Sequence, residues 1–396
     1  MWINRDIQPV LASLCGQRPA IVLTGARQTG KTSLLRHLFP TCAFVSLDLP
    51  SEAALAEERP DEFLRKYPAP VIVDEVQYAP GLFRHLKHVI DQRRGERGLY
   101  MLTGSQKFTL MKTVSESLAG RAAILDLDTL SFAEVAKAHP DATVTDHLLR
   151  GGFPELWEDR SIDATSFLRS YVATYLERDL RAVLRVTNLR DFERFVRACA
   201  LRSGQLVNKA DLARDVGISA STANEWLSAL QASSQIALVE PWFANGSKSI
   251  TKMPKLFFCD SGLLLFLLNI RSREELEGSP LRGSIFETAV YCELRKRLAL
   301  RQELESLFFF RDRSKEVDFV LHRGGRFHLF ECKWTEVPTS ADAAGLDHVA
   351  GVLGEATILS RTIVCRTPRP FPLPGGVSAI GIADLATAIP ALDQAA

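Results

Sequence analysis

A glycine-rich loop between an apolar strand and a helix is the feature that most constrains how this chain folds. Residues 21–23 are Ile-Val-Leu and predict a buried strand. Gly25 opens a loop that closes at Gly30, and Lys31 begins a predicted helix with leucines at positions 34, 35 and 38. A strand, a tight loop and a helix in this order form the first unit of a parallel sheet covered by helices.

The loop has the spacing Gly-x-x-x-x-Gly-Lys-Thr, which suits a nucleotide triphosphate better than a chance turn. Glycines allow backbone N–H groups to surround phosphate oxygens, and the helix N-terminus adds partial positive charge. We expect Lys31 to reach the outer phosphates and the Thr32 hydroxyl to hold Mg²⁺. The predicted ATP-binding residues are Gly25, Ala26, Arg27, Gln28, Thr29, Gly30, Lys31, Thr32 and Ser33.

Two acidic residues end a later predicted strand. Residues 70–73 are Pro-Val-Ile-Val, and Asp74 and Glu75 follow directly. Behind a phosphate loop, this pattern predicts that Asp74 holds Mg²⁺ through water and that Glu75 polarises the attacking water. Thr103 and Ser105 lie at the tip of another predicted strand, as γ-phosphate sensors or as parts of an ordinary turn.

An arginine that follows a glycine is a further catalytic candidate. Arg121 comes directly after Gly120. It is either a finger that stabilises developing charge in a neighbouring subunit, which implies a homo-oligomer, or a surface arginine. Strands alternate with helices over residues 1–150, which predicts a three-layer α/β domain with its ligand at the carboxyl ends of the strands.

These motifs together resemble the AAA-type ATPases common in bacteria and archaea, whose C-terminal region was long of unknown function. The resemblance implies ATP binding by the loop and hydrolysis through Asp74 and Glu75. A second sensor arginine is not identifiable, and Arg178 and Arg181 are guesses. The segments that carry the resemblance are 25–32, 71–75, 102–105, 118–121, 151–155 and 175–179, so it covers nearly the whole chain.

The middle of the chain, residues 151–270, predicts a helical linker followed by a winged helix-turn-helix. The linker contains a long charged helix at 167–186. Residues 207–230 then predict two helices, with a sharp turn at Gly217 and a capping serine at Ser219. Predicted strands on either side of a lysine-bearing loop complete the winged pattern.

DNA is the partner that this pattern suggests, through donors on the second helix and lysines on the wing. The second helix offers no arginine or lysine, so a winged helix that only packs against the ATPase or a partner subunit is the alternative. The candidate contacts are Ser219, Ser221, Thr222, Asn224 and Glu225 on the helix and Lys248, Lys252 and Lys255 on the wing.

The last region, residues 280–396, carries acidic residues on predicted strands joined by a hairpin at positions 324 and 325. Side chains alternate along a strand, so Glu331 and Lys333 share one face, and Asp318 lies on the preceding strand. This arrangement resembles the PD-(D/E)-x-K nuclease core, with Glu287 in the place of the helical acid. The strand reads Glu316-Val-Asp318 instead of carrying a Pro-Asp pair, which weakens the match.

The nuclease resemblance implies a restriction-endonuclease-like α/β domain. Asp318 and Glu331 would hold Mg²⁺, Glu287 would complete the metal shell, and Lys333 would orient or activate water. The alternatives are a surface set of salt bridges, worth little individually, or an inactive nuclease-like fold used for binding.

Composition restricts the remaining possibilities. With 396 residues and a net charge of +1, the chain suits two or three domains whose nucleic-acid contacts come from local patches. Seven scattered cysteines suit a reducing cytoplasm, and the longest apolar run, 262–268, is too short to cross a membrane. We therefore predict a cytoplasmic, Mg²⁺-dependent ATPase coupled to a DNA-binding, nuclease-like region. The alternative is an ATP-controlled DNA- or protein-binding switch whose nuclease-like region is inactive.

Overall fold

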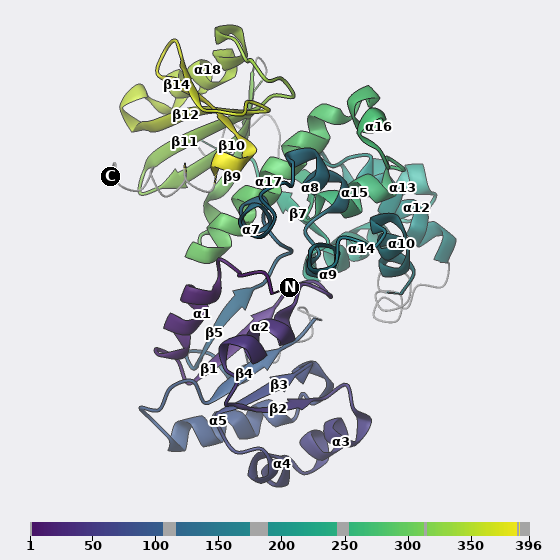
Figure 1. Ribbon diagram of the computed structural model, residues 1–396, viewed down its shortest axis with the longest axis vertical. Coiled ribbons are helices and arrows are strands. Elements are labelled where there is room, and N and C mark those ends of the chain that lie inside the picture. The colour runs from purple at the N-terminus through teal and green to yellow at the C-terminus, as the bar shows by residue number, and fades with distance from the viewer. Residues whose placement is uncertain are drawn as a thin grey trace.

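The computed structural model describes residues 2–105, 116–174, 189–243, 253–312, 315–385 and 388. These residues form three modules, each with its own β-sheet (Figure 1). The predicted segment 175–179, Arg178, Arg181, Lys248 and Lys252 lie outside the described residues, as does the end of the helix predicted at 167–186.

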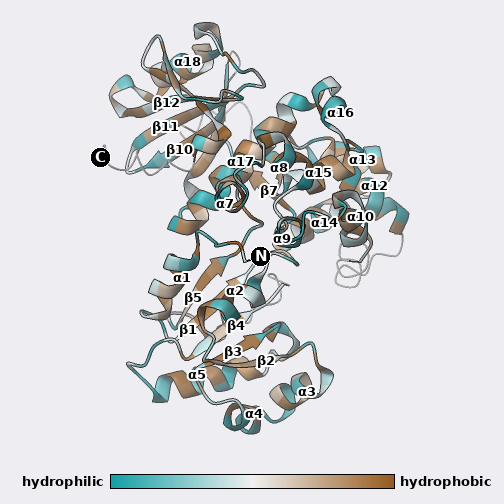
Figure 2. Ribbon diagram, viewed as in Figure 1, coloured by the Kyte–Doolittle hydropathy of each residue, from teal (hydrophilic) through white to brown (hydrophobic). Residues whose placement is uncertain are grey.

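The first module is a parallel sheet with the strand order β2-β3-β4-β1-β5. Every residue of β1, β3 and β4 is buried, as expected where helices cover both faces, and Figure 2 shows the apolar character of these strands. The strands are β1 (Ala20–Thr24), β2 (Ala43–Ser46), β3 (Val71–Asp74), β4 (Tyr100–Thr103) and β5 (Ala122–Asp126).

Helices pack on both faces of this sheet, so the predicted three-layer α/β fold is confirmed for the first module. Ile21 and Leu23 of β1 join an apolar cluster with α1 and α2. Ala20 and Val22 face the other way, into a cluster with α3, α4 and α5. The helices are α1 (Gln8–Cys15), α2 (Lys31–Leu38), α3 (Pro50–Glu58), α4 (Pro60–Lys66) and α5 (Leu82–Gln92).

The segment after β2 forms two helices that are separated next to a proline. Helix α3 ends at Glu58, and α4 begins at Pro60. Proline has no N–H to donate to the preceding turn and is favoured in the first turn of a helix, so Pro60 ends one helix and starts the next.

The middle module is mostly helical and includes a small antiparallel sheet with the strand order β6-β8-β7. The predicted turn lies at Gly217, whose φ of 85° ends α13, and Ser219 caps α14 by accepting a hydrogen bond from the N–H of Thr222. The elements are α7 (Phe132–Ala138), α8 (Val144–Arg150), α9 (Pro154–Glu158), α10 (Ala164–Tyr171), α12 (Leu189–Ala200), β6 (Gln205–Leu206), α13 (Lys209–Val216), α14 (Ala220–Ala232), β7 (Ile236–Val239), β8 (Lys255–Phe258), α15 (Ser261–Leu267) and α16 (Arg273–Gly278).

The last module is a six-stranded mixed sheet with the order β13-β14-β12-β11-β10-β9. The hairpin predicted at positions 324 and 325 joins β10 to β11, whose pairing ends at Arg323 and Arg326. We did not predict β12, which pairs parallel with β11. The elements are α17 (Arg282–Arg301), β9 (Leu307–Arg311), β10 (Glu316–Arg323), β11 (Arg326–Cys332), α18 (Ala344–Leu353), β12 (Ile358–Cys365), β13 (Phe371–Leu373) and β14 (Val377–Gly381).

Helix α17 lies where the three modules meet (Figure 1). A single apolar cluster joins its buried face to the helices of the middle module and to Phe319 and Phe330 of the last sheet. The chain after β7 also pairs with β9, where the N–H of Trp242 donates to the carbonyl of Phe309 at 2.6 Å. The middle and last modules are therefore packed as one continuous body. Within the described part of the chain, no helix has both the length and the apolar character needed to cross a membrane.

Candidate nucleotide site and carboxylate cluster

The loop between β1 and α2 has a conformation that requires its glycines. Gly25 has a φ of +137°, and a Cβ there would lie 2.2 Å from the carbonyl oxygen of Leu127. Gly30 is left-handed, with a φ of 87°, at the N-cap of α2. A side chain at Gly25 would displace backbone, so the glycine spacing reflects close packing as well as access to phosphate.

Lys31 is folded back over this loop. Its ammonium donates to the carbonyl oxygens of Gly25 and Ala26, at 3.1 and 2.7 Å. The residue is only 6% exposed. Burial lowers the pKa of Lys31 from 10.5 to about 8, while the nearby carboxylates of Glu75 and Asp74 oppose the shift. The ammonium is thus held among backbone oxygens close to both predicted acids.

Asp74 lies at the carboxyl end of β3, in contact with the loop helix. Its Oδ1 accepts hydrogen bonds from the hydroxyls of Thr32 and Thr103, and its Oδ2 accepts one from Ser46 at 3.1 Å. Thr32 and Asp74, which the sequence assigns to one Mg²⁺, are therefore in direct contact. Hydroxyl and carboxylate oxygens are the donors that Mg²⁺ prefers, so this set fits the ion.

Glu75 is held by the end of the neighbouring strand. The hydroxyl and the N–H of Ser105 donate to Glu75 Oε2 at 3.0 and 3.2 Å, and the side chain of Gln77 donates to the same oxygen. The backbone N–H of Glu75 donates to Thr103 Oγ1 at 3.2 Å. Both sensor candidates, Thr103 at the end of β4 and Ser105 just after it, thus contact the acidic pair directly.

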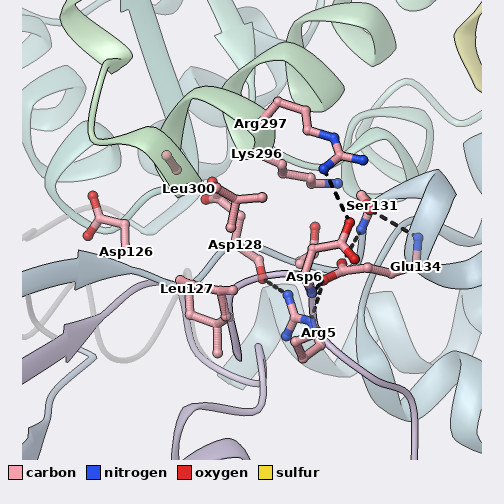
Figure 3. A pocket seen from close by; sticks show the side chains of 13 residues that line it. Arg5, Asp6, Asp126, Leu127, Asp128, Ser131, Glu134, Lys296, Arg297 and Leu300 are labelled. Carbon is pink, nitrogen blue, oxygen red and sulfur yellow. Dashed lines mark hydrogen bonds and ion pairs between the residues drawn. The ribbon is translucent and has the colours of Figure 1, made fainter. Parts of the chain in front are cut away.

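Arg5 supports the phosphate loop from behind, and sequence reasoning missed it. Its guanidinium donates to the carbonyl of Thr29 at 3.0 Å, to the carbonyl of Asp128 at 2.7 Å and to Glu134 Oε1 at 3.2 Å. Figure 3 shows Arg5 between the chain that follows β5 and Glu134. No local sequence motif indicates this role, because the partners of Arg5 lie between 24 and 129 residues away in the sequence.

Arg121 lies at the amino end of β5, whereas the phosphate loop lies at the carboxyl ends of the strands. It precedes β5, whose other end pairs with the end of β1 where the loop begins. Its guanidinium makes two hydrogen bonds to Asp91, at 2.7 and 2.9 Å. Arg121 is therefore not part of the nucleotide site of its own chain.

Helix α17 is joined by buried charges to the chain that follows β5 and to the first residue of α7. Arg295 contacts Asp128 at 3.0 Å, Lys296 donates to the carbonyl of Leu130 at 2.8 Å, and Glu293 accepts from the N–H of Phe132 at 3.0 Å. The pocket drawn in Figure 3 lies at this junction, with a volume of about 30 Å³. That volume is far below the roughly 300–1,000 Å³ of clefts that hold drug-sized ligands.

The predicted nuclease-like residues lie near one another, but a lysine lies among them. Lys255 Nζ is 2.7 Å from Glu287 Oε1 and 3.5 Å from Asp318 Oδ1, and it also contacts Glu316 Oε1. Lys255 is only 2% exposed. The prediction that Lys255 contacts a DNA phosphate is therefore wrong, because three carboxylates from other elements bury it.

Glu331 and Lys333 pair with each other beside this group. Lys333 Nζ donates to Glu331 Oε1 at 2.8 Å, and the N–H of Cys332 donates to Asp318 Oδ2 at 2.8 Å. Burial and the nearby Asp318 raise the pKa of Glu331, as expected for crowded carboxyl groups. In the described parts of the chain, no group of three or more His, Cys, Asp or Glu residues is placed to hold a metal ion.

Three domain families match the chain. Residues 17–136 match an AAA domain, residues 141–274 match the domain of unknown function DUF8612, and residues 282–385 match the domain of unknown function DUF4143. The AAA match contains the loop, the acidic pair and Arg121, and the last match contains all the predicted nuclease-like residues.

Similar solved structures include the Walker-type ATPase PABY2304 of Pyrococcus abyssi, with 16% identity and a TM-score of 0.44, covering 67% of this chain and 96% of that chain. Another is AMPPCP-bound DnaA from Aquifex aeolicus, with 13% identity and a TM-score of 0.30, covering 57% of this chain and 85% of that chain.

Two relatives are much more similar in sequence. Uncharacterized protein Rv2008c of Mycobacterium tuberculosis is 32% identical over 341 residues, which are 85% of this chain and 75% of the relative. Uncharacterized protein Mb2031c of Mycobacterium bovis matches with the same identity and coverage. The chain therefore belongs to the same family as these mycobacterial proteins, and its first module is an AAA domain of the P-loop ATPase class.

Proposed function

We propose that the chain binds ATP with Mg²⁺ at residues 25–33, hydrolyses it, and uses the nucleotide state to control how the other modules engage DNA. The observation that carries the proposal is the convergence of Lys31, Thr32, Asp74 and Glu75 at the carboxyl edge of one parallel sheet. This edge is where ligands bind in open α/β sheets.

Each residue has a distinct task at this edge. Lys31 exchanges its carbonyl partners for phosphate oxygens, while Thr32 and Asp74 hold the ion. Mg²⁺ supplies charge that offsets the developing negative charge on the phosphates. Glu75, fixed by Ser105, orients the attacking water.

The first test separates binding from hydrolysis. Lys31→Ala should abolish ATP binding measured by calorimetry, whereas Glu75→Gln should keep binding and lose about 100-fold or more in turnover. Lys66→Ala, which removes an exposed lysine paired with Glu52, is the control and should match the parent. Unchanged turnover in Lys31→Ala would overturn the phosphate-loop assignment.

The role of Arg121 depends on a second copy of the chain. A finger acting in a neighbouring subunit predicts that specific ATPase activity rises with protein concentration. It also predicts that adding an excess of Arg121→Ala protein depresses the activity of the parent. A specific activity independent of concentration would argue for a monomer in which Arg121 only pairs with Asp91.

DNA engagement is proposed for the middle module, as a winged helix-turn-helix made of α13, α14 and the small sheet. Ser221, Asn224 and Glu225 are exposed on α14. Lys209 of α13 supplies a cation beside them, since its Nζ contacts Asn224 Oδ1 at 2.5 Å. Lys209→Ala should weaken binding to labelled duplex DNA and reduce the magnitude of the salt slope by about one. No binding by the parent would favour a protein partner.

The last module is proposed as a nuclease-like domain that binds without cutting while Lys255 neutralises its acids. This is the alternative favoured by the buried Lys255 contacts. A cutting enzyme would nick plasmid DNA with Mg²⁺ or Mn²⁺ and lose that activity in Glu331→Ala and Lys333→Ala. Intact plasmid under both metals, with DNA binding retained, supports the non-cutting form.

A further inference from the structure

We propose that Lys255 is a built-in cation that takes the place of a divalent metal ion in the carboxylate cluster of the last module and keeps that cluster closed. The cluster is defined as Glu287, Glu316 and Asp318 with the lysine among them. The comparison with a metal rests on the proposed nuclease-like identity of this module, whereas the electrostatic part rests on the contacts alone.

The geometry of Lys255 matches the needs of this cluster. An ammonium has three N–H donors, and three carboxylates surround it: Glu287 from α17, and Glu316 and Asp318 from β10. The ring of Phe309 from β9 lies 5.5 Å from the same nitrogen. Three elements of the last module, α17, β9 and β10, therefore converge on the charge of a lysine from the middle module.

The charges around the cluster show which carboxylates depend on Lys255. Glu316 has a second partner, because Arg311 contacts its Oε2 at 3.2 Å. Lys333 pairs with Glu331 rather than with the cluster. Lys255 is the cation that the described contacts give to Glu287, which is buried. A carboxylate removed from water needs such a partner, so removing Lys255 leaves Glu287 uncompensated.

A divalent metal and the Lys255 ammonium cannot share this place. Mg²⁺ or Mn²⁺ would need the oxygens of Glu287 and Asp318 at about 2.0–2.2 Å. Those oxygens already face Nζ, and a second cation among them would meet a positive charge. The cluster is thus closed to metal for as long as Lys255 remains in it.

Lys255 is also fixed by its backbone. It begins β8 and pairs with Leu206 of β6 and Val239 of β7. Because its side chain is only 2% exposed, the ammonium stays in the cluster while the small sheet of the middle module is docked. This contact therefore works as an electrostatic latch that makes the state of the acidic cluster depend on the docking of the middle module.

The experiment removes the charge of Lys255 and measures whether a divalent metal ion then binds in the carboxylate cluster. Lys255→Met, which keeps most of the stem, should lower the apparent Tm of the full chain by at least about 5 °C, since it breaks a buried pair. Lys137→Met removes an exposed lysine paired with Asp6 at 2.7 Å and should change Tm by less than about 1 °C.

Adding Glu287→Gln to Lys255→Met should recover at least half of the lost Tm, because it removes the uncompensated carboxylate. Calorimetry with Mn²⁺, without nucleotide, should find one more bound ion in Lys255→Met than in the parent, and Mn²⁺ should raise the Tm of that variant. The double variant should lose both metal effects.

Three results would overturn the proposal: a parent protein whose Mn²⁺ binding disappears in Glu287→Gln, a Lys255→Met variant as stable as the parent, or a stable Lys255→Met variant that binds no additional ion. If Lys255→Met does not fold, folding of the double variant supports the latch, and failure of both variants contradicts it. None of these measurements needs ATP turnover or DNA, so a failed latch and a failed proposed function are told apart.

Discussion

At the scale of single residues, the protonation of Lys31 changes with pH in an accessible range. Burial lowers its pKa to about 8, so the charged form is populated below that pH and is lost as the pH rises through it. Bound phosphates favour the charged form and raise the pKa again. We therefore expect the Kd for ATP to be constant from pH 7 to 7.5 and to rise by up to about tenfold per pH unit above pH 8.

Titration calorimetry between pH 7 and 9.5 measures this dependence. Lys31→Ala is the control, because any residual affinity should lack the rise above pH 8. A parent protein with the same Kd at pH 7.5 and pH 9 would show that the ammonium is not needed for binding.

Single residues also mark where sequence reasoning succeeds and where it stops. The placement of Gly25, Lys31 and Asp74 close together could be predicted, because the spacing of each motif and the apolar strand before it are visible in a short stretch of sequence. Lys255 was placed wrongly because a lone lysine after a loop is normally exposed. Its burial depends on Glu287 and Asp318, which are 32 and 63 residues further along the chain.

At the scale of elements, runs of apolar residues predict where the strands lie, and nearby glycines and prolines predict where several elements begin or end. The buried strands β1 and β3 appear as continuous apolar segments, and a pair of glycines fixed the hairpin after β10. What the sequence could not give is the partner of each element. Nothing local in α17 says that Arg295 meets Asp128, which is 167 residues away.

The contact between α17 and the first module can be tested through that pair. Arg295→Met leaves Asp128 buried without its partner; their side chains are 11% and 6% exposed. We expect a loss of about 3 kcal/mol in the free energy of unfolding, seen as a fall of at least about 6 °C in the Tm of the transition.

Arg297→Met is the matched control on the same helix, because Arg297 meets Asp6 at 3.5 Å with more exposure. It should change the Tm by no more than about 2 °C. Combining Arg295→Met with Asp128→Asn should recover part of the loss. Equal Tm values for Arg295→Met and Arg297→Met would mean that this pair does not hold α17 in place.

At the scale of the whole molecule, α17 lies between the two candidate sites. Its N-terminal half carries Glu287 in the carboxylate cluster, and its C-terminal half carries Arg295, which contacts Asp128 after β5. They are eight positions apart along the helix, a rise of about 12 Å. Asp128 in turn meets Arg5 through its carbonyl, and Arg5 holds the phosphate loop at Thr29. A continuous set of contacts thus joins the candidate nucleotide site to the carboxylate cluster.

If these contacts transmit the nucleotide state, ATP and ADP should give different affinities for DNA. The hydrolysis-deficient Glu75→Gln protein allows each state to be held during an anisotropy titration. Coupling free energies between sites are typically about 1–3 kcal/mol, so we expect the two Kd values to differ by about fivefold or more. Because coupling is reciprocal, saturating DNA must change the relative affinities for ATP and ADP by the same factor.

The route of this coupling is tested in the same background. Adding Arg295→Met, measured well below its Tm, should bring the two DNA affinities to within about twofold while each nucleotide still binds with its former affinity in the absence of DNA. Adding Arg297→Met should leave the difference intact. If Arg295→Met preserves the full difference, the signal travels by another path. If Glu75→Gln itself binds DNA equally with ATP, with ADP and without nucleotide, the ATPase does not control DNA engagement, and the proposed switch is wrong at the level of the whole molecule.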